Sequence, residues 1–172
     1  MDNLVDFINY ALLPSFVLLL SDILPIQLRL AGGSLVLLSA CYQFSHREAK
    51  TSDHFFRGFP SYWNLLVIYL HLLETPTWFN SATIVFFAAL AFLPVYFVYP
   101  SRTETLKTLT LWMAAPWIAL IVAAVWLLEP GSNPQLPRVL TFISLYYILY
   151  YSALSLIRSE EHTSELQSRQ SI

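Results

Sequence analysis

Apolar stretches without a charged residue or histidine alternate with short polar segments along most of this chain. They cover residues 7–21, 30–45, 58–70, 75–101, 108–128 and 139–157. A membrane-spanning helix needs about 20 mostly apolar residues, with a range of roughly 17–25. With flanking residues included, the pattern predicts six helices, at about 4–21, 27–45, 61–74, 78–99, 106–128 and 138–157. The third is short, so we expect it to be tilted or only partly inserted.

The composition is typical of a membrane protein. Of the 172 residues, 56% are hydrophobic and 12% are charged, whereas a soluble domain usually carries about 25% charged residues. We therefore expect an all-α fold: a polytopic membrane helix bundle, with about six transmembrane helices present of a larger bundle. The single cysteine, Cys41, lies in an apolar run and is expected to be a small core residue.

Prolines mark several of the predicted helix boundaries, namely Pro25, Pro60, Pro76 and Pro100. Three others fall inside predicted helices: Pro14, Pro94 and Pro116. Membrane helices tolerate proline where neighbouring groups satisfy the freed backbone carbonyls, so we keep these helices intact.

The distribution of basic residues predicts the orientation. With the N-terminus in the cytoplasm and alternating spans, the inside loops hold Arg47, Lys50, Arg57, Arg102 and Lys107. The outside loops then hold only Arg29 and Arg138. This bias follows the positive-inside rule. It places the N-terminus and the loop 46–60 on the same, cytoplasmic side, provided that the short third segment spans.

Two aspartates, Asp2 and Asp6, stand four residues apart at the start of the first apolar run. In a helix they share one face, with Cβ atoms about 5–6 Å apart. One interpretation of the pair is a divalent cation site, because Mg²⁺ and Mn²⁺ prefer hard oxygen ligands, although a pair alone is a weak signal. Acids at a helix N-terminus also interact favourably with the helix dipole. The pair alone therefore leaves both interpretations open.

Basic and aromatic residues alternate in the segment 42–64, which contains the predicted cytoplasmic loop. Lys50 and Arg57 suit a phosphate or diphosphate. The aromatic residues Phe55, Phe56, Phe59, Tyr62 and Trp63 could pack around a quaternary ammonium. An aromatic belt beside positive-inside charges would give the same pattern, so composition does not decide between a substrate site and a membrane interface.

The same segment resembles a known family. Lys50-Thr51, Asp53 to Phe56 and Gly58 to Asn64 are similar to the signature of the bacterial phosphatidylcholine synthases, a branch of the CDP-alcohol phosphotransferase superfamily. Tyr99-Pro100-Ser101-Arg102 and the tyrosine-rich last helix, with Tyr146, Tyr147, Tyr150 and Tyr151, are also similar to it. The resemblance covers about residues 1–157, which we take as a partial membrane domain of that superfamily.

The resemblance implies a metal site at the two aspartates. The superfamily motif is D-x2-D-G-x2-A-R-x8-G-x3-D-x3-D, and Asp2 and Asp6 match its last two aspartates. In the family, four aspartates hold divalent metal (Mn²⁺ or Mg²⁺), and the last, here Asp6, is the proposed catalytic base. The first half of the motif has no counterpart in this sequence. We expect it upstream of Met1, and we expect the chain as written to be an inactive fragment with its first helices missing.

The implied reaction transfers a phosphatidyl group from CDP-diacylglycerol to choline and releases CMP. The resemblance then makes Lys50, Arg57 and Arg102 candidate phosphate contacts, and Tyr62 and Trp63 candidate choline contacts. Asn64 could hydrogen-bond the substrate or cap the third helix.

The expected setting is the bacterial inner membrane, with the site facing the cytoplasm and membrane lipid around it. No nucleic-acid partner is expected, and a homodimer is compatible with a sequence that does not specify oligomeric state.

Two alternatives remain open. One is a related phosphatidyltransferase that uses a different alcohol, such as glycerol, inositol or serine. The other is a non-catalytic membrane protein or a transporter. His71, among leucines of the third helix, is better explained as a satisfied or helix-bridging histidine than as a proton relay.

The polar tail 158–172 departs from the membrane pattern without transition. Residues 158–168 resemble the translation of a sequencing-library adapter fused in frame. We interpret the tail as artefactual, with a short solvated acidic tail as the alternative, and exclude it from functional reasoning.

Overall fold

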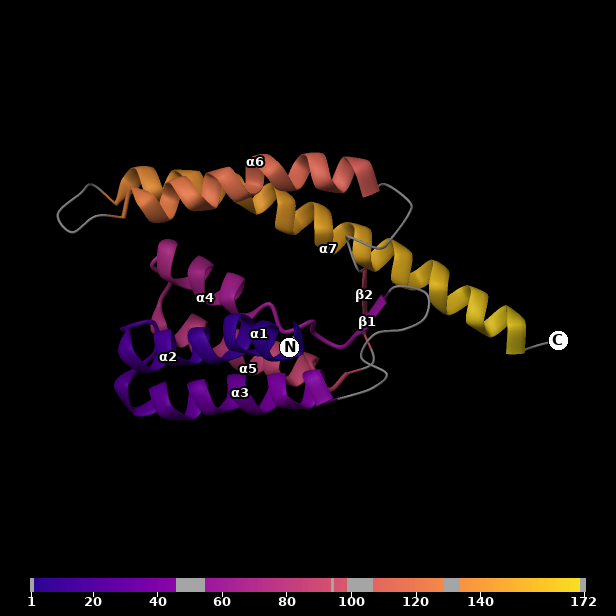
Figure 1. The fold of residues 1–172 in the computed structure, drawn as a ribbon, viewed down its shortest axis with the longest axis horizontal. Coiled ribbons are helices and arrows are strands. Elements are labelled where there is room, and N and C mark those ends of the chain that lie inside the picture. Colours follow the sequence, from indigo (N-terminus) through magenta and orange to yellow (C-terminus); the bar gives the residue numbers. More distant parts are fainter. Residues whose placement is uncertain (1, 46–54, 94, 99–106, 129–133, 171–172) are drawn as a thin grey trace. The chain divides into compact units, whose positions relative to one another are not determined.

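The structure, a computed structural model, describes the chain except residues 1, 46–54, 94, 99–106, 129–133 and 171–172 (Figure 1). It divides into two compact units. Unit 1 comprises residues 1–49 and 57–94, and unit 2 comprises residues 50–56 and 95–172. Each unit is described by itself.

Unit 1 begins with a helical rod in three parts: α1 (Asp2–Phe7), the π-helical turn η1 (Ile8–Leu12) and α2 (Leu13–Leu20). The first predicted helix is therefore confirmed. The π turn places Pro14 in the first turn of α2, where a missing N–H costs little because it would have no partner within that helix. The hydroxyl of Ser15 donates to the carbonyl of Ala11 at 2.8 Å, which satisfies one acceptor of the π turn.

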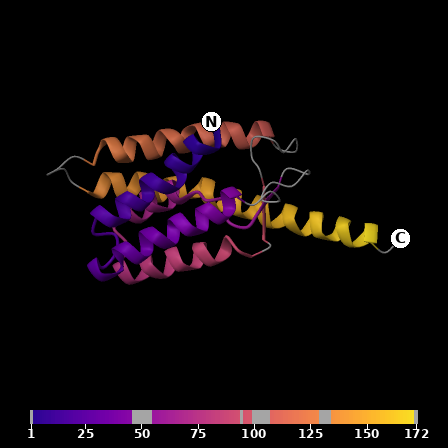
Figure 2. The ribbon, with the colours of Figure 1, turned by 60° about the horizontal axis from the view of Figure 1, so that its bottom comes forward.

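The next three helices of unit 1 are α3 (Arg29–Ser45), preceded by the 3-10 turn η2 (Ile26–Leu28), then α4 (Trp63–Leu72) and α5 (Thr77–Leu90). In both ribbon views α3 runs alongside α2, against which it packs (Figures 1 and 2). A Cβ on Gly33 would lie 3.2 Å from the carbonyl oxygen of Ser15, so the absence of a side chain allows this close approach. The core between the helices includes Leu18, Val36, Trp63, Val67, Ile84 and Ala88.

The fourth predicted helix, 78–99, is wrong at its C-terminal end. Helix α5 stops at Leu90, and residues Tyr96–Val98 form strand β2 instead. Strand β2 pairs with β1 (Phe55–Arg57), which was also not predicted. Proline disfavours helical geometry in the residue before it, so Pro94 favours a break. The aromatic and β-branched residues of β2 suit an extended chain.

Unit 2 is dominated by α6 (Lys107–Trp126) and α7 (Gln135–Gln170), which pack against each other. Their contacts pair Thr110 with Tyr150 and Met113 with Tyr146, so the two helices are antiparallel. Pro116 lies within α6, as predicted. Helix α7 continues past the predicted end at 157 because the tail contains neither glycine nor proline to stop it. The origin of that tail stays a prediction.

Two of the described helical segments are long and apolar enough to cross a membrane, Lys107–Trp126 and Gln135–Arg158. The apolar helices Leu4–Leu20, Trp63–Leu72 and Thr77–Leu90 are shorter. The ten residues of α4 extend for about 15 Å at 1.5 Å per residue, roughly half of the hydrocarbon thickness. The largely helical fold is confirmed, whereas six full spans and the size of the bundle stay predictions.

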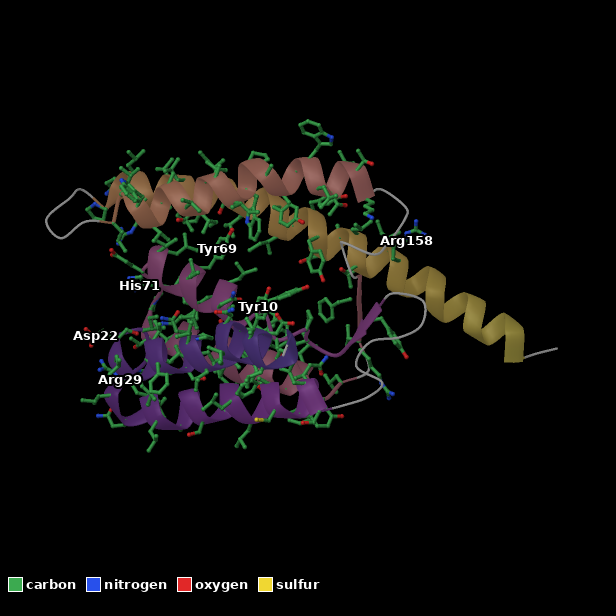
Figure 3. All side chains as sticks on the ribbon, viewed as in Figure 1. Tyr10, Asp22, Arg29, Tyr69, His71 and Arg158 are labelled. Atoms are coloured by element: carbon green, nitrogen blue, oxygen red, sulfur yellow. The ribbon has the colours of Figure 1, made fainter. Side chains whose placement is uncertain are left out.

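The structure shows the exposure of Cys41 and the position of His71 within its helix, neither of which the sequence predicted correctly. Cys41 is exposed on α3, so its assignment to the core was wrong. Apolar runs do not reveal which face of a helix packs inward when the helix is apolar all round. His71 is exposed in the last turn of α4, at the end of a helix and not in its middle (Figure 3).

Candidate functional site

The two aspartates lie in one short helix at the start of unit 1. Helix α1 begins at Asp2, and Asp6, four residues later, is half-buried. The predicted i, i+4 spacing on a helix is therefore confirmed, and it puts the two residues on one helical face. The π turn η1 comes immediately after this helix; π-helical turns are rare and frequently occur at functional sites.

Aromatic contacts fix where this helix lies. The ring of Phe7 meets that of Phe44, at the end of α3, edge to face at 5.8 Å between centroids. The ring of Tyr10 meets that of Tyr62, just before α4, at 6.2 Å. Phe44 precedes the loop 46–60 and Tyr62 comes after it. Within unit 1, the first helical rod therefore contacts the residues that flank this loop on both sides, and the placement of the aspartates beside the loop on the cytoplasmic side stays a prediction.

The chain leaves the loop through a tight segment, residues 57–62, which we call the loop exit. Gly58 has φ +81°, and a Cβ there would lie 2.4 Å from the carbonyl oxygen of Ala91. The N–H of Phe59 donates to the carbonyl of Leu90 at 3.2 Å. Ser61 has φ +58°, a conformation that non-glycine residues rarely adopt. The loop exit is therefore held against the end of α5 by backbone contacts that allow little variation.

A side chain of α3 completes this attachment. The amide Nε2 of Gln43 donates to the carbonyl of Arg57 at 2.8 Å. Gln43 is 7% exposed although it is polar. The sequence alone did not identify Gln43 as important. The only feature that could have indicated it is that a single glutamine stands near the end of an apolar run.

The two predicted choline contacts lie in different surroundings. Trp63 is 0% exposed, and its ring meets that of Phe59 edge to face at 5.1 Å. Phe59 in turn packs on Phe87 of α5 at 4.8 Å. Tyr62 is half-buried and faces Tyr10. The geometry gives Trp63 a packing role, and Tyr62 is the one of the two that contacts the π turn after the helix of the aspartates.

Within the described residues of this region, three buried polar atoms lack a hydrogen-bond partner: Oε1 of Gln43, Oγ of Ser61 and Nε1 of Trp63. A buried polar atom left unpaired typically costs about 1–3 kcal/mol. The loop exit therefore keeps its shape at an energetic cost, which the packing of Phe59 and Trp63 offsets.

The remaining predicted contacts have mixed outcomes. Asn64 is the second residue of α4, after the N-cap position at Tyr62, and its Oδ1 accepts the N–H of Leu65 at 2.8 Å, one of the donors that the first helical turn leaves free. Its expected role as a substrate contact or a cap stays a prediction. Arg57 ends strand β1 and is half-buried. Lys50 and Arg102 lie outside the described residues, as does the Tyr99–Arg102 segment.

The donor set can be compared with what a divalent cation needs. No group of three or more His, Cys, Asp or Glu side chains forms among the residues that the structure describes. Mg²⁺ is commonly bound by one or two carboxylates together with substrate phosphates. Asp6 offers one half-buried carboxylate for such a site, whereas the side chain of Asp2 lies outside the described residues, so a metal site at this pair stays a prediction.

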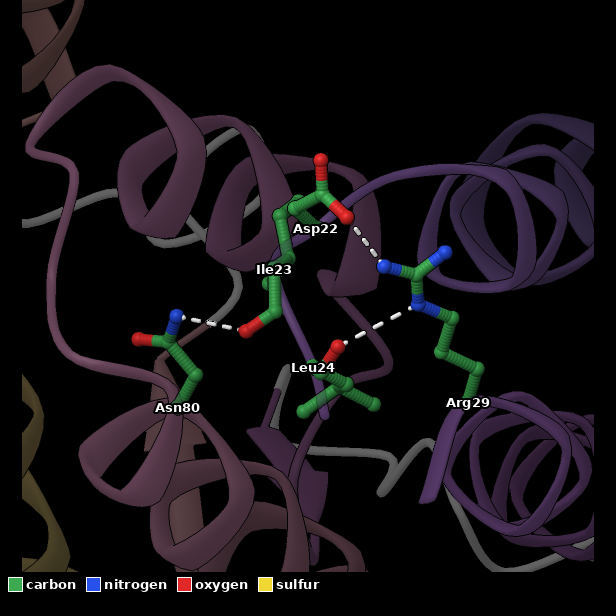
Figure 4. A network of polar contacts seen from close by, with 5 residues as sticks. All are labelled: Asp22, Ile23, Leu24, Arg29 and Asn80. Carbon is green, nitrogen blue, oxygen red and sulfur yellow. Dashed lines mark hydrogen bonds and ion pairs between the residues drawn. The ribbon is translucent and has the colours of Figure 1, made fainter. Parts of the chain in front are cut away.

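The opposite end of unit 1 is built differently. Arg29 pairs with Asp22 and donates through Nε to the carbonyl of Leu24 at 3.2 Å (Figure 4). Asn80 of α5, 1% exposed, donates through Nδ2 to the carbonyl of Ile23 at 2.8 Å. Figure 3 shows Asp22 and Arg29 together, away from Tyr10. This network joins the α2–α3 connection to α5, and the importance of Asn80 was also missed from the sequence.

Comparisons with known proteins place the chain in a family. No family model and no solved structure matches it. The phosphatidylcholine synthase of Legionella pneumophila is 34% identical over 163 residues, covering 92% of this chain and 63% of that protein. The phosphatidylcholine synthase of Legionella bozemanae is also 34% identical, with 92% and 74% covered.

A third relative, the phosphatidylcholine synthase of Borreliella burgdorferi, is 33% identical over 147 residues, covering 86% of this chain and 62% of that protein. The chain thus spans between 62% and 74% of the length of these three relatives. Identity at this level extends over nearly the whole chain and agrees with the resemblance of the loop 46–60 and its flanks. The chain therefore belongs to the phosphatidylcholine synthase family.

Proposed function

We propose that the protein to which this chain belongs transfers a phosphatidyl group from CDP-diacylglycerol to choline and releases CMP. The names of its relatives support this assignment. The structural observation that carries it is the contact between Tyr10 and Tyr62. This contact joins the π turn that follows the helix of Asp2 and Asp6 to Tyr62, one of the residues that resemble the family signature.

In the proposed reaction, the choline oxygen forms a bond to the phosphorus of the phosphatidyl group, and the bond from that phosphorus to the CMP oxygen breaks. Asp6 accepts the proton of the choline hydroxyl as a general base. A divalent ion, Mn²⁺ or Mg²⁺, would supply neutralisation of the diphosphate and stabilisation of the leaving oxygen. Asp2 and Asp6 are the residues of this chain that would hold it.

Substrate contacts extend from this centre. Arg57, Lys50 and Arg102 provide positive charge for the diphosphate. Tyr62 offers an aromatic face to the quaternary ammonium, an interaction worth about 0.5–2 kcal/mol. Trp63, the second choline contact expected from the sequence, acts in this proposal through its packing beside Tyr62 and Phe59. Asn64 holds the start of α4.

The proposed setting is the bacterial inner membrane, with CDP-diacylglycerol supplied from the surrounding lipid. Two helices long and apolar enough to span support a membrane location. The bias of basic residues towards loops on the side of Asp6 supports a site that faces the cytoplasm.

The test uses the protein encoded by the complete genomic reading frame that contains residues 1–157, expressed in membranes that lack phosphatidylcholine. We expect metal-dependent formation of labelled phosphatidylcholine from labelled choline and CDP-diacylglycerol, with release of CMP. Asp6→Asn should lower kcat by about 100-fold or more, since general base catalysis typically contributes 10²–10⁴-fold.

The matched control is Asp22→Asn, which removes an exposed carboxylate at the opposite end of unit 1 and should leave activity unchanged. Glycerol, inositol and serine are tested as competing acceptors. CMP release that depends on one of these alcohols and not on choline would overturn the substrate assignment, and full activity of Asp6→Asn would overturn the base assignment.

A further inference from the structure

A side chain from outside the loop, that of Gln43, is hydrogen-bonded to the loop exit. Its Nε2 donates to the carbonyl of Arg57 at 2.8 Å, one residue before Gly58, whose φ is +81°. A Cβ built on Gly58 would lie 2.4 Å from the carbonyl oxygen of Ala91 and 3.3 Å from Oε1 of Gln43, so the backbone runs closely between α3 and α5. Gln43 therefore lies at the point where the chain direction is set.

The residues after Gly58 determine where Tyr62 lies. Phe59 is bound to Leu90 through its backbone N–H and packs against Trp63 and Phe87. Ser61 takes a positive φ, and Tyr62 then reaches Tyr10. A shift of the Arg57 carbonyl would be passed along this short segment, because residues 58–62 form neither a helix nor a strand that could absorb it.

The burial of Gln43 is hard to explain by stability alone. Its Oε1 is buried without a hydrogen-bond partner within the described residues, so the amide is only half satisfied. An apolar residue of similar volume at this position would remove the cost of the unpaired oxygen, and what it would lose is the single hydrogen bond from Nε2 to the carbonyl of Arg57. The amide is therefore better explained by the specific position it gives to Arg57 than by a contribution to core stability.

From these observations we infer that Gln43 is a positioning residue for acceptor-alcohol binding, acting through Arg57 and the loop exit on Tyr62. The inference rests on the proposed function, in which Tyr62 borders the choline site. It assigns to Gln43 a role in substrate binding without direct contact with substrate.

The experiment measures kcat and KM for choline and for CDP-diacylglycerol in the complete protein and in Gln43→Leu, which keeps the volume and removes the amide. We expect KM for choline to rise about tenfold, which corresponds to about 1.4 kcal/mol, with KM for CDP-diacylglycerol unchanged. A merely structural role would instead lower the amount of active protein, and so the apparent kcat, at unchanged KM. The matched control is Asn80→Leu, a buried amide that tethers the opposite end of unit 1 and should leave KM for choline unchanged.

A second readout does not depend on activity. Trypsin cleaves after arginine, and the carbonyl of Arg57 is the group that Gln43 holds. We expect cleavage at the Arg57–Gly58 bond to be faster in Gln43→Leu than in the parent protein, with cleavage after Arg138 unchanged. Unchanged cleavage and unchanged KM for choline in an active protein would overturn the inference. A parent protein that makes no phosphatidylcholine but shows the change in cleavage would instead overturn the proposed function and leave the tether standing.

Discussion

The ring of Tyr10 lies 6.2 Å from the ring of Tyr62, at an interplanar angle of 61°. These residues belong to the first helical rod and to the segment before α4, and the loop 46–60 separates them in sequence. Their contact joins two features, each of which has an explanation unrelated to catalysis. The aspartates could be acids at a helix N-terminus, and the aromatic residues could form a belt at a membrane interface. The contact brings the helical rod that begins with the two aspartates against the loop exit, at one end of unit 1.

The aromatic contact itself leads to a prediction about choline. Replacing Tyr62 with alanine should raise KM for choline by about 2- to 30-fold, since a cation–π contact contributes about 0.5–2 kcal/mol. Tyr62→Phe keeps the ring and should behave like the parent. Kinetics with saturating CDP-diacylglycerol provide the measurement. An equal rise of KM for both substrates in Tyr62→Ala would show that the residue acts through general packing.

Trp63 should behave differently from Tyr62. Because its side chain is fully buried against Phe59, Trp63→Ala should destabilise the protein by about 3–5 kcal/mol. Thermal unfolding in detergent, together with the yield of folded protein, tests this. Trp63→Phe refills most of the space and should recover most of the stability. A stable Trp63→Ala protein with a raised KM for choline alone would instead make the residue a direct choline contact.

Gly58 should not tolerate a side chain. Gly58→Ala would place Cβ against the backbone carbonyl of Ala91 at a φ of +81°, and backbone strain of this kind costs about 1–3 kcal/mol before the clash is added. The control is Gly32→Ala, whose Cβ would meet only the flexible end of Leu24. Unfolding temperatures should fall clearly for Gly58→Ala and little for Gly32→Ala. Equal unfolding temperatures for the two variants would contradict the conformation of the loop exit.

Asn80 should be important for stability and not for catalysis. Its Nδ2 donates to the carbonyls of Ile23 and Thr75, at 2.8 and 3.1 Å. Asn80→Ala leaves buried acceptors unpaired, at about 1–3 kcal/mol each. Ser81→Ala, on the same helix, removes only an exposed hydroxyl bond to Thr77 and serves as the control. We expect a lower unfolding temperature for Asn80→Ala with KM values unchanged; altered KM for choline would mean that the two ends of unit 1 are coupled.

In unit 2, the hydroxyl groups of Thr110 and Tyr150 lie 2.8 Å apart across α6 and α7. A double-mutant cycle with Thr110→Val and Tyr150→Phe should give a coupling energy of about 0.5–1.5 kcal/mol, the usual net value of a hydrogen bond. Chemical unfolding in mixed micelles is the measurement. Strictly additive effects of the two substitutions would show that the hydroxyl groups do not interact.

The sequence by itself determined most of the helical segments and the spacing of Asp2 and Asp6 on the first of them. Long apolar runs bounded by charges favour helices because backbone groups must bond internally where water is absent. Short connections between these helices also fit the contacts of the first rod with Phe44 and Tyr62, the residues that flank the loop. The resemblance to a family could also be recognised from the sequence alone, because it rests on the residue types of the segment 50–64.

The tertiary structure decided which side chains meet. Helices that are apolar on every face give no periodic signal for the packed side, so the burial of Trp63, the exposure of Cys41 and the contact between Tyr10 and Tyr62 were not predictable. The same holds for Gln43, because a hydrogen bond to the carbonyl of Arg57 depends on where the loop returns and not on local propensity. Pro94 favours the break after α5, but the pairing of β2 with β1 is a long-range interaction that an apolar run does not encode.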